Sequence, residues 1–186
     1  MARSQQDAGD PFAEIRAATV AHRARHGCGA HSYTEGPLLS VIAAACAARR
    51  IVELGTALGY TALCLAHGAE AAHVDTIERD PEHVRLARGH IAAAGMASRI
   101  TVHEDDFETV LPRLSPPYDL GFFDGFAPTP AHLAEFRRLL RPRGVLVSTN
   151  LDFGRADAYR AALADPRQFI TSFAAEDGRT AISIKL

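Results

Sequence analysis

The stretch Val52-Glu53-Leu54-Gly55-Thr56-Ala57-Leu58-Gly59-Tyr60-Thr61 decides the fold of this chain. An apolar segment ends in an acidic residue, passes through a turn hinged by Gly55 and Gly59, and opens a helix at Tyr60. Glycine at the two hinge positions lets the backbone turn sharply and approach a ligand closely. Open α/β sheets hold nucleotide-like ligands where a strand runs into such a turn and then into a helix. We therefore predict an α/β protein with a ligand site at this turn.

Strand-like and helix-like segments alternate after this turn. Strands are expected at 51–54, 74–77, 100–103, 118–123 and 144–149, and helices at about 60–67, 81–94, 107–111, 130–140 and 155–163. This alternation predicts a parallel sheet with helices on both faces. The last two strand-like runs, 169–174 and 180–185, are joined by Asp177-Gly178, which is typical of an antiparallel hairpin. The expected fold is a mostly parallel seven-stranded sheet with a C-terminal antiparallel hairpin.

Two helices are expected before the first strand. One follows Asp10-Pro11 and ends near Gly27, because an aspartate before a proline is typical of an N-cap and the first helical position. The second spans about 36–48. We expect residues 11–48 to cap the first strand, residues 1–10 to be disordered, and residues 1–186 to form a single domain.

Composition disfavours several classes of function. The net charge of −2 argues against nucleic acid as the main partner, because such proteins usually carry a basic patch. The chain has no uncharged apolar run of about 18 residues that would predict a membrane span. Its first ten residues contain no hydrophobic signal segment. With three cysteines and no Cys-x-x-Cys pair, a disulfide framework or zinc site is disfavoured. We expect a cytoplasmic protein.

The three cysteines have different surroundings in the sequence. Cys46 and Cys64 fall in Ala/Leu-rich helical stretches and are predicted to fill the core. Cys28 lies in His26-Gly27-Cys28-Gly29-Ala30-His31. The glycines favour a flexible loop there, and metal binding by the cysteine with its two flanking histidines is the alternative.

Carboxylates stand at or just after the ends of four predicted strands, at Glu53, Glu78, Asp106 and Asp124. Because parallel strands end at one edge of the sheet, these acids should face a common ligand. Glu53 could accept hydrogen bonds from an ammonium group. Glu78 has two acceptor oxygens that suit the vicinal diol of a ribose, and Asp106 suits an exocyclic amine such as that of adenine. This acidic edge suits an amino group, a ribose and an adenine better than a pyrophosphate.

A nicotinamide-dependent oxidoreductase is the alternative enzyme class, since it shares the strand–turn–helix and the ribose-binding acid. The spacing from Gly55 to Gly59 is Gly-x-x-x-Gly, so the dinucleotide fingerprint Gly-x-Gly-x-x-Gly is absent. The terminal hairpin also argues against this class.

The run 53–61 resembles the cofactor loop of class I S-adenosylmethionine-dependent methyltransferases. More narrowly, the chain is similar to the catechol/caffeoyl-coenzyme A O-methyltransferase family, in which Glu-x-Gly-Thr-x-x-Gly-Tyr-Ser is usual and Thr61 here replaces the serine. Segments 100–107, 118–124, 140–147 and 177–180 resemble further family segments in the same order. The resemblance spans about residue 32 to the C-terminus. It implies a Rossmann-like methyltransferase fold and transfer of a methyl group from S-adenosylmethionine to a hydroxyl oxygen of a small-molecule acceptor.

The resemblance also implies which residues hold the cofactor. The methionine part would be bound by the turn and the helix start, the ribose by an acid, the adenine by the segment after the third strand, and the whole would be covered by the segment 32–34. The implied residues are Glu53, Gly55, Thr56, Gly59, Tyr60 and Thr61 for the methionine part, Glu78 for the ribose, and Asp106 and Phe107 for the adenine. Asp124 and Tyr33 are further implied cofactor-binding residues.

The acceptor half of the chain departs from the family pattern. Metal-dependent members bind Mg²⁺ through an aspartate that matches Asp124 and through an Asp-Asn pair that is Thr149-Asn150 here. A hydroxyl in place of a carboxylate weakens a Mg²⁺ site. Asp124 and Asn150 therefore form a degenerate metal site, and we expect weak or no metal dependence. Ala127 stands where the family has a lysine near the acceptor, so a non-catalytic cofactor-binding subunit is a further alternative.

A general base is needed only if the acceptor must lose a proton. Asp124 and His31 are the catalytic candidates, with Asp152 and His132 as weaker ones. His132 lies just inside a helix after Pro130, and we expect it at the surface. Family members often form dimers, so a homodimer is one expectation.

Overall fold

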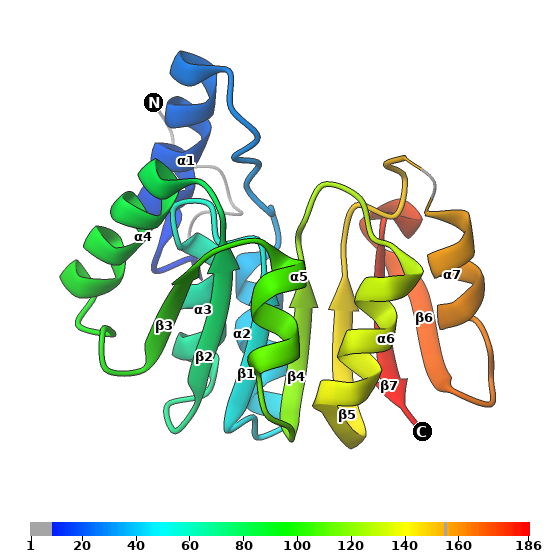
Figure 1. Cartoon of the computed structure of the whole chain (residues 1–186). Coiled ribbons are helices and arrows are strands. Elements are labelled where there is room, and N and C mark those ends of the chain that lie inside the picture. The colour runs from blue at the N-terminus through cyan, green and yellow to red at the C-terminus, as the bar shows by residue number, and fades with distance from the viewer. Residues whose placement is uncertain (1–8, 155) are drawn as a thin grey trace.

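The computed structural model describes residues 9–154 and 156–186. Over these residues the chain forms one seven-stranded sheet in the order β3-β2-β1-β4-β5-β7-β6, with helices on both faces (Figure 1). The strands are β1 (Arg50–Leu54), β2 (His73–Glu78), β3 (Ile100–Glu104), β4 (Tyr118–Phe123), β5 (Leu140–Ser148), β6 (Phe169–Ala175) and β7 (Thr180–Lys185). The α-helices are α1 (Ala13–His26), α2 (Gly36–Ala45), α3 (Tyr60–Gly68), α4 (Pro81–Ala93), α5 (Phe107–Val110), α6 (Pro130–Leu139) and α7 (Asp157–Leu163).

The direction of each strand confirms the predicted fold class. β1 pairs in parallel with β2 and β4, β2 with β3, and β4 with β5. β7 runs antiparallel to both β5 and β6, which is the predicted C-terminal hairpin. The chain builds outward from β1 to β3 and then returns to place β4 on the other side of β1. In such sheets the crevice for a ligand opens at this reversal of strand order.

Two apolar layers cover the sheet, because its central strands are apolar on both faces as expected for parallel strands. Ile51 points into the layer under α2, α3 and α4, whereas Val52 points into the layer under α5, α6 and α7. Both side chains are completely buried. The sheet is therefore a rigid platform whose strand ends are the natural place for side chains that act on a ligand.

Local capping explains several helix boundaries. Asp80 caps α4 by accepting hydrogen bonds from the backbone N–H groups of Glu82 and His83, with Pro81 in the first helical turn. Thr129 and His132 form a reciprocal capping box at the start of α6. These two starts agree with the sequence expectation.

The start of α1 differs from the expectation. The helix begins at Ala13, with Phe12 as its N-cap, and not directly after Asp10. The Asp10 carboxylate instead accepts from the Phe12 backbone N–H at 2.9 Å and from the Tyr60 hydroxyl. Asp10 is therefore buried and hydrogen-bonded to the start of α3. The segment 1–10 was expected to be disordered, and its residues 1–8 lie outside the described residues.

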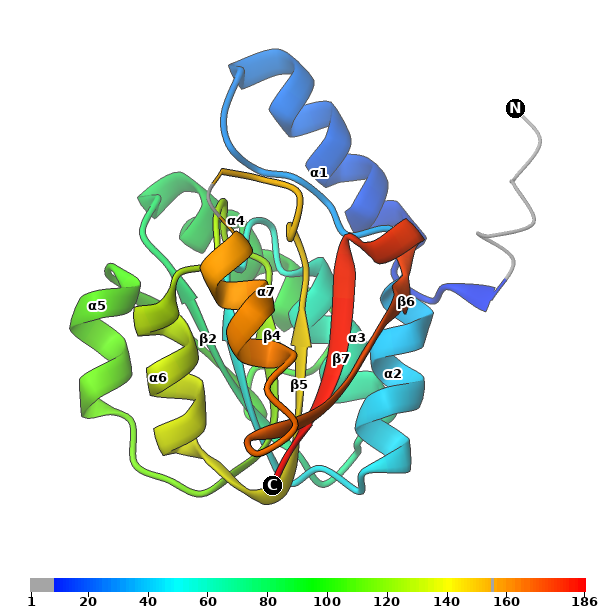
Figure 2. The same cartoon turned by 90° about the vertical axis from the view of Figure 1, so that its right-hand side faces the viewer.

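The two N-terminal helices occupy different places. α2 lies beside α3 on one face of the sheet, whereas α1 stands above the carboxyl ends of the strands (Figures 1 and 2). The segment between them, 27–35, crosses back toward the sheet and carries Tyr33 to a buried position against Phe122. The N-terminal part of the chain thus helps to enclose the strand ends.

Among the described residues, none of the helices is both long enough and apolar enough to cross a membrane.

The close approach of α2 to α3 depends on Gly68. A Cβ atom at this position would lie 2.0 Å from the backbone oxygen of Ser40. We expect Gly68→Ala to lower the free energy of unfolding, measured by urea denaturation, by about 1–3 kcal/mol, because the two backbones would have to separate. Gly89→Ala on α4 is the matched control, since a Cβ there meets nothing within 4 Å, and it should raise stability by about 0.5–1 kcal/mol. Similar effects of the two changes would contradict this account.

Candidate functional site

A cavity of about 600 Å³ opens above the carboxyl ends of β1, β2 and β4, where the strand order reverses. Its walls come from the turn after β1, the segments after β2, β3 and β4, and the N-terminal segment 29–33. These are the strand ends at which the sequence places carboxylates. The size and place of the cavity suit a small ligand held at the switch point of the sheet.

The glycine turn brings the backbone against this cavity. Gly55 has a φ of +97° and Gly59 a φ of +92°, both in the region that favours glycine. A Cβ atom at Gly55 would lie 2.7 Å from the backbone oxygen of Asp124. Gly55 lines the cavity, whereas Gly59 packs against Ala87 on α4. The first glycine therefore sets how closely a ligand can approach, and the second lets α3 pack against α4.

A buried chain of hydroxyls supports the turn from below. The Thr56 hydroxyl lies 2.5 Å from that of Thr76, which donates to Glu53 Oε2, also at 2.5 Å. Burial raises the pKa of Glu53 to about 8, although the hydroxyls of Thr61 and Thr76 oppose the shift. The other carboxylate oxygen, Oε1, is buried with no hydrogen-bond partner of normal geometry. Glu53 lies beneath the turn and outside the cavity wall.

Thr76 is a site residue that the sequence reading missed. It faces Glu53 in the parallel register of β1 and β2. The available signal was a hydroxyl side chain between Asp75 and Ile77 in the predicted strand 74–77, because a polar group buried in a sheet needs a hydrogen-bond partner.

Glu78 is held in place by three backbone N–H groups. Ala57 donates to Oε2, and Arg79 and Asp80 donate to Oε1, each at 3.0 Å. A carboxylate has about four acceptor positions, so these bonds orient the group and leave it able to accept from a ligand. Glu78 lines the cavity, as the ribose assignment requires.

The segment after β3 forms the adjoining wall. Asp106 is the N-cap of α5 but makes no side-chain capping bond, and its Oδ1 lies 3.7 Å from Arg79 Nη1. Phe107 presents its ring next to that of His132 in a T-shaped arrangement. Both Asp106 and Phe107 line the cavity beyond Glu78.

Asp124 follows β4 and receives hydrogen bonds from two neighbours. Its Oδ1 accepts from the Thr149 hydroxyl at 2.8 Å and from Asn150 Nδ2 at 3.2 Å. Burial raises the pKa of the Asp124 carboxyl to about 7, with Thr149 opposing the shift and the charge of Glu176 adding to it. Asp124 is thus a carboxylate in the cavity wall that can exchange a proton near neutral pH.

The predicted metal residues, Asp124 and Asn150, do lie together, but as a hydrogen-bonded cluster. Thr149 stands in the position of a carboxylate ligand and directs its hydroxyl at Asp124. The Asn150 amide nitrogen faces Asp124 and also donates to the backbone oxygen of Gly125 at 2.8 Å. Mg²⁺ requires several oxygen ligands in octahedral geometry, whereas two of the three side chains here present hydrogen-bond donors to the third. This arrangement does not fit a Mg²⁺ ion.

Aromatic side chains form the outer rim of the cavity. Phe126 is 80% exposed and stacks on Phe153, with ring centroids 5.8 Å apart and an interplanar angle of 13°. The ring of His31 lies 6.4 Å from that of Phe153, and all three residues line the cavity. Burial lowers the pKa of His31, and the charge of Arg23 adds to this effect. The rim is therefore a flat apolar surface beside the His31 imidazole.

The expectation that His132 lies at the surface is wrong. This residue is 8% exposed and its ring packs near those of Phe107 and Phe123. The first turn of α6 lies against the end of β4, so the capping histidine points into the protein. Its position in a helix start suggested exposure because the sequence does not show what packs on that turn. Asp152, the other weaker candidate base, is exposed and lies outside the cavity wall.

The structure brings most of the predicted site residues to one cavity. The predicted residues in its wall are Tyr33, Gly55, Thr56, Tyr60, Thr61, Glu78, Asp106, Phe107, Asp124, His31, Asn150 and the weaker candidate His132. The wall also contains residues that the sequence reading did not select, among them Arg79, His83 and Phe153. These residues neighbour predicted ones in the chain, but no residue pattern distinguished them.

Comparisons with known proteins agree on one protein family. The family described as "Methyltransferase domain" matches residues 52–150. A putative O-methyltransferase of Mycolicibacterium vanbaalenii is 35% identical over 168 residues, which cover 86% of this chain and 74% of the relative. A putative O-methyltransferase of Mycobacterium sp. (strain JLS) is 40% identical over 125 residues, covering 65% and 57% of the two chains. The chain thus spans little more than half the length of that relative.

A solved structure shows the same fold. It is described as an O-methyltransferase from Bacillus cereus in complex with SAH, and it matches with a TM-score of 0.79 at 21% identity. The match covers 97% of this chain and 94% of the other. These relatives favour the methyltransferase assignment over the nicotinamide-dependent alternative.

The raised pKa of Asp124 has a consequence for stability. Its folded-state pKa of about 7 lies above the ordinary 3.8, so the folded protein holds this proton more tightly and loses stability as the pH rises from about 4 to 7. Asp124→Asn removes that loss. We expect its stability advantage over the unmodified protein, measured by urea denaturation, to grow between pH 5 and pH 8 by on the order of 2–3 kcal/mol.

Asp152→Asn provides the control, because it removes an exposed carboxylate from the nearby loop. Comparison of the two variants separates the effect of the buried carboxyl from that of removing a charge in this region. A stability offset for Asp124→Asn that does not change with pH would refute the raised pKa.

Proposed function

Because this chain belongs to the methyltransferase-domain family, we propose that it is an S-adenosylmethionine-dependent O-methyltransferase that acts on a small-molecule acceptor. The observation that carries the proposal is the cavity at the sheet's switch point, bounded by the Gly55 turn and by a Glu78 carboxylate that three backbone N–H groups orient. A carboxylate fixed in this way is suited to accept from vicinal ribose hydroxyls.

The residues around the turn fit the rest of this cofactor. Buried polar atoms are normally paired, yet Glu53 Oε1 beneath the turn and Ser32 Oγ at the cavity wall make no hydrogen bond. Gly55 has no Cβ atom, which lets the turn lie directly against the Asp124 backbone at the cavity wall. Asp106 and Phe107 offer a polar and an aromatic contact for an adenine. When bound, the cofactor supplies an electrophilic methyl group on a sulfonium. A positive charge close to Glu53 or Asp124 would favour their ionised forms.

Asp124 is the proposed general base. It lines the cavity, and burial raises its pKa to about 7, which suits a group that must take a proton near neutral pH. Its Oδ1 is held by Thr149 and Asn150, so the carboxylate has a fixed orientation in the cavity wall. Asp124 would take the proton of the acceptor hydroxyl, and the cofactor, when bound, would supply the methyl group with its sulfur leaving as a neutral thioether. Alignment of the reactants within the cavity provides the remainder of the rate enhancement.

The aromatic rim supports a flat, hydroxyl-bearing aromatic compound as the acceptor. Phe126 and Phe153 present stacked faces beside the cavity, and an exposed phenylalanine pair of this kind offers stacking area to a planar ring. His31 closes the same rim and is a second candidate proton acceptor. Ala127 stands in the position of the family lysine, and among the described residues no lysine or arginine lines this part of the cavity.

The donor groups around Asp124 support methyl transfer with weak or no dependence on Mg²⁺. Thr149 and Asn150 both direct hydrogen atoms at the carboxylate that a metal would need. A small-molecule acceptor is further supported by the limited volume of the cavity, about 600 Å³. Three expectations remain predictions: that the protein has no nucleic-acid partner, that it forms a homodimer and that it is cytoplasmic.

A calorimetric titration of S-adenosylmethionine into metal-stripped protein, repeated with Mg²⁺, tests the proposal. We expect a micromolar dissociation constant that Mg²⁺ leaves unchanged, followed by transfer of labelled methyl groups to phenolic acceptors. Binding without transfer to any member of a broad acceptor panel would favour the non-catalytic alternative. Failure to bind in either condition would overturn the proposal.

Glu78→Gln tests the ribose assignment. The amide keeps one acceptor oxygen but loses the second, so S-adenosylhomocysteine binding should weaken by about 1–3 kcal/mol, as for a lost hydrogen bond to a charged group. Isothermal titration calorimetry gives the affinity directly. Glu104→Gln at the end of β3 is the control, because this acid is exposed and lies outside the cavity wall. Unchanged affinity in Glu78→Gln would count against the assignment.

The pH dependence of the reaction tests the general base. Only the ionised Asp124 can accept a proton, so kcat/KM should rise with pH through about 7, the pKa of this carboxyl. Asp124→Asn should lower kcat/KM by roughly 10²–10⁴-fold and remove that rise. Retention of the rise in Asp124→Asn would transfer the role to another group such as His31, for which His31→Gln is the matching variant.

A further inference from the structure

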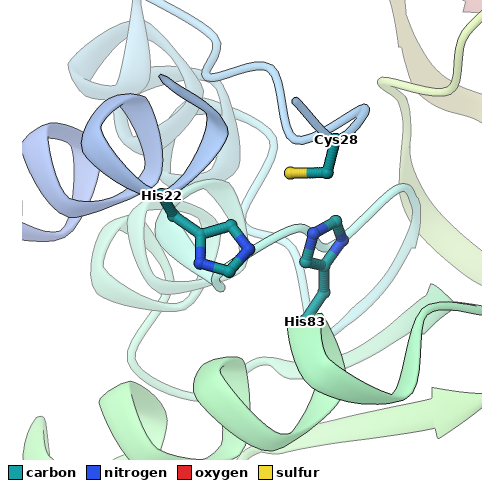
Figure 3. A group of neighbouring side chains, drawn as sticks. All are labelled: His22, Cys28 and His83. Carbon is teal, nitrogen blue, oxygen red and sulfur yellow. The ribbon is translucent and has the colours of Figure 1, made fainter. Parts of the chain in front are cut away.

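Three side chains from separate parts of the chain converge next to the cavity. His22 lies on α1, Cys28 on the loop after it, and His83 on the first turn of α4 (Figure 3). One potential ligand atom from each residue lies within 4.8 Å of the other two. The sequence had suggested His26 and His31 as the partners of Cys28. Instead, the His26 ring stacks on that of His22 and His31 faces Phe153.

His83 shows that this convergence is more than crowding. The residue is 5% exposed, and its Nε2 atom is buried without a hydrogen-bond partner. Its other ring nitrogen, Nδ1, lies 3.8 Å from Glu78 Oε1. Histidines that bind metals commonly place one ring nitrogen toward a carboxylate and keep the other for the ion. Buried polar atoms are otherwise satisfied, so the unpaired Nε2 points to a missing ligand.

The other two residues complete a suitable donor set. His22 is 6% exposed, and its ring lies against that of His83 with centroids 5.3 Å apart. Cys28 is a free, half-buried cysteine whose sulfur reaches the space between the two rings (Figure 3). A thiol with two imidazoles is the kind of set that binds borderline-soft transition metals and not Mg²⁺.

We propose that His22, Cys28 and His83 form a binding site for a divalent metal ion of the Zn²⁺ class, with solvent in the fourth position. Bonds of about 2.0–2.3 Å to a tetrahedral Zn²⁺ would draw the three ligand atoms somewhat closer together than they lie here. The cysteine is on a glycine-flanked loop, Gly27-Cys28-Gly29, that can make this small adjustment.

An ion at this site would tie α1 and its following loop to α4. The segment that starts one residue after Cys28 forms one side of the cavity, from Gly29 to Tyr33. The ion would therefore hold this wall at its base, and His83 would link it to Glu78. The metal site itself does not depend on methyl transfer, so it can be tested with no cofactor present.

Cobalt(II) provides a direct optical test with the full-length, metal-stripped and reduced protein. We expect one equivalent of Co²⁺ to produce a thiolate-to-metal charge-transfer band in the near ultraviolet together with visible bands of four-coordinate intensity. Zn²⁺ should displace it. Cys28→Ser should abolish the charge-transfer band and weaken Zn²⁺ binding by at least about tenfold, and His83→Gln should weaken binding similarly.

Cys46→Ser is the matched control, because Cys46 is also half-buried but lies at the end of α2, away from this site. It should bind both metals as the unmodified protein does. Circular dichroism establishes that each variant is folded, and His22→Gln substitutes for Cys28→Ser if that variant fails. No charge-transfer band in the unmodified protein, or a band that Cys28→Ser leaves intact, would overturn the proposal.

Discussion

The close contact between the turn after β1 and the end of β4 is the constraint on which the site depends. The Asp124 backbone N–H donates to the Leu54 oxygen at 2.8 Å, and the Gly55 N–H donates to the Ile77 oxygen at 3.1 Å. These bonds continue the sheet one step beyond its strands and place three chain segments at a common edge. Only a residue without a Cβ atom fits at Gly55, because any side chain would meet the Asp124 carbonyl. Glycine thereby sets Asp124 and the turn at the separation that forms the cavity.

Burial of carboxylates at this edge lowers the stability of the fold at neutral pH but gives the groups pKa values suited to proton transfer. Glu53 and Asp124 have pKa values raised to about 8 and 7 because desolvation disfavours their charged forms. Glu78, in contrast, receives three backbone hydrogen bonds that hold a charged acceptor in place. The cavity wall therefore contains one carboxyl group suited to proton exchange, Asp124, and one suited to steady hydrogen bonding, Glu78, while Glu53 lies beneath the turn. A ligand that carries a positive charge and a diol would satisfy both kinds.

The two halves of the cavity differ in how closely they follow the family. On one side, Gly55 of the turn, Glu78 and Asp106 line the cavity where the family resemblance predicts cofactor contacts. On the other side, the Thr149 hydroxyl occupies the place of a metal-binding carboxylate, and Ala127 that of a lysine. An exposed aromatic rim stands there instead. The chemistry of methyl transfer tolerates this change, since the acceptor needs orientation and a proton acceptor but no obligatory ion.

Local patterns in the sequence were enough to determine the elements and their order. The strand at 118–123 was predicted to the residue, and the carboxylates at strand ends were assigned to one edge because parallel strands share it. Tertiary structure alone decided which distant groups meet. The burial of His132, the attachment of Asp10 to Tyr60 and the approach of His83 to His22 and Cys28 all depend on contacts between different elements of the chain. Periodicity shows which face of a helix is apolar, but the neighbours of that face depend on how helices pack, which no local pattern records.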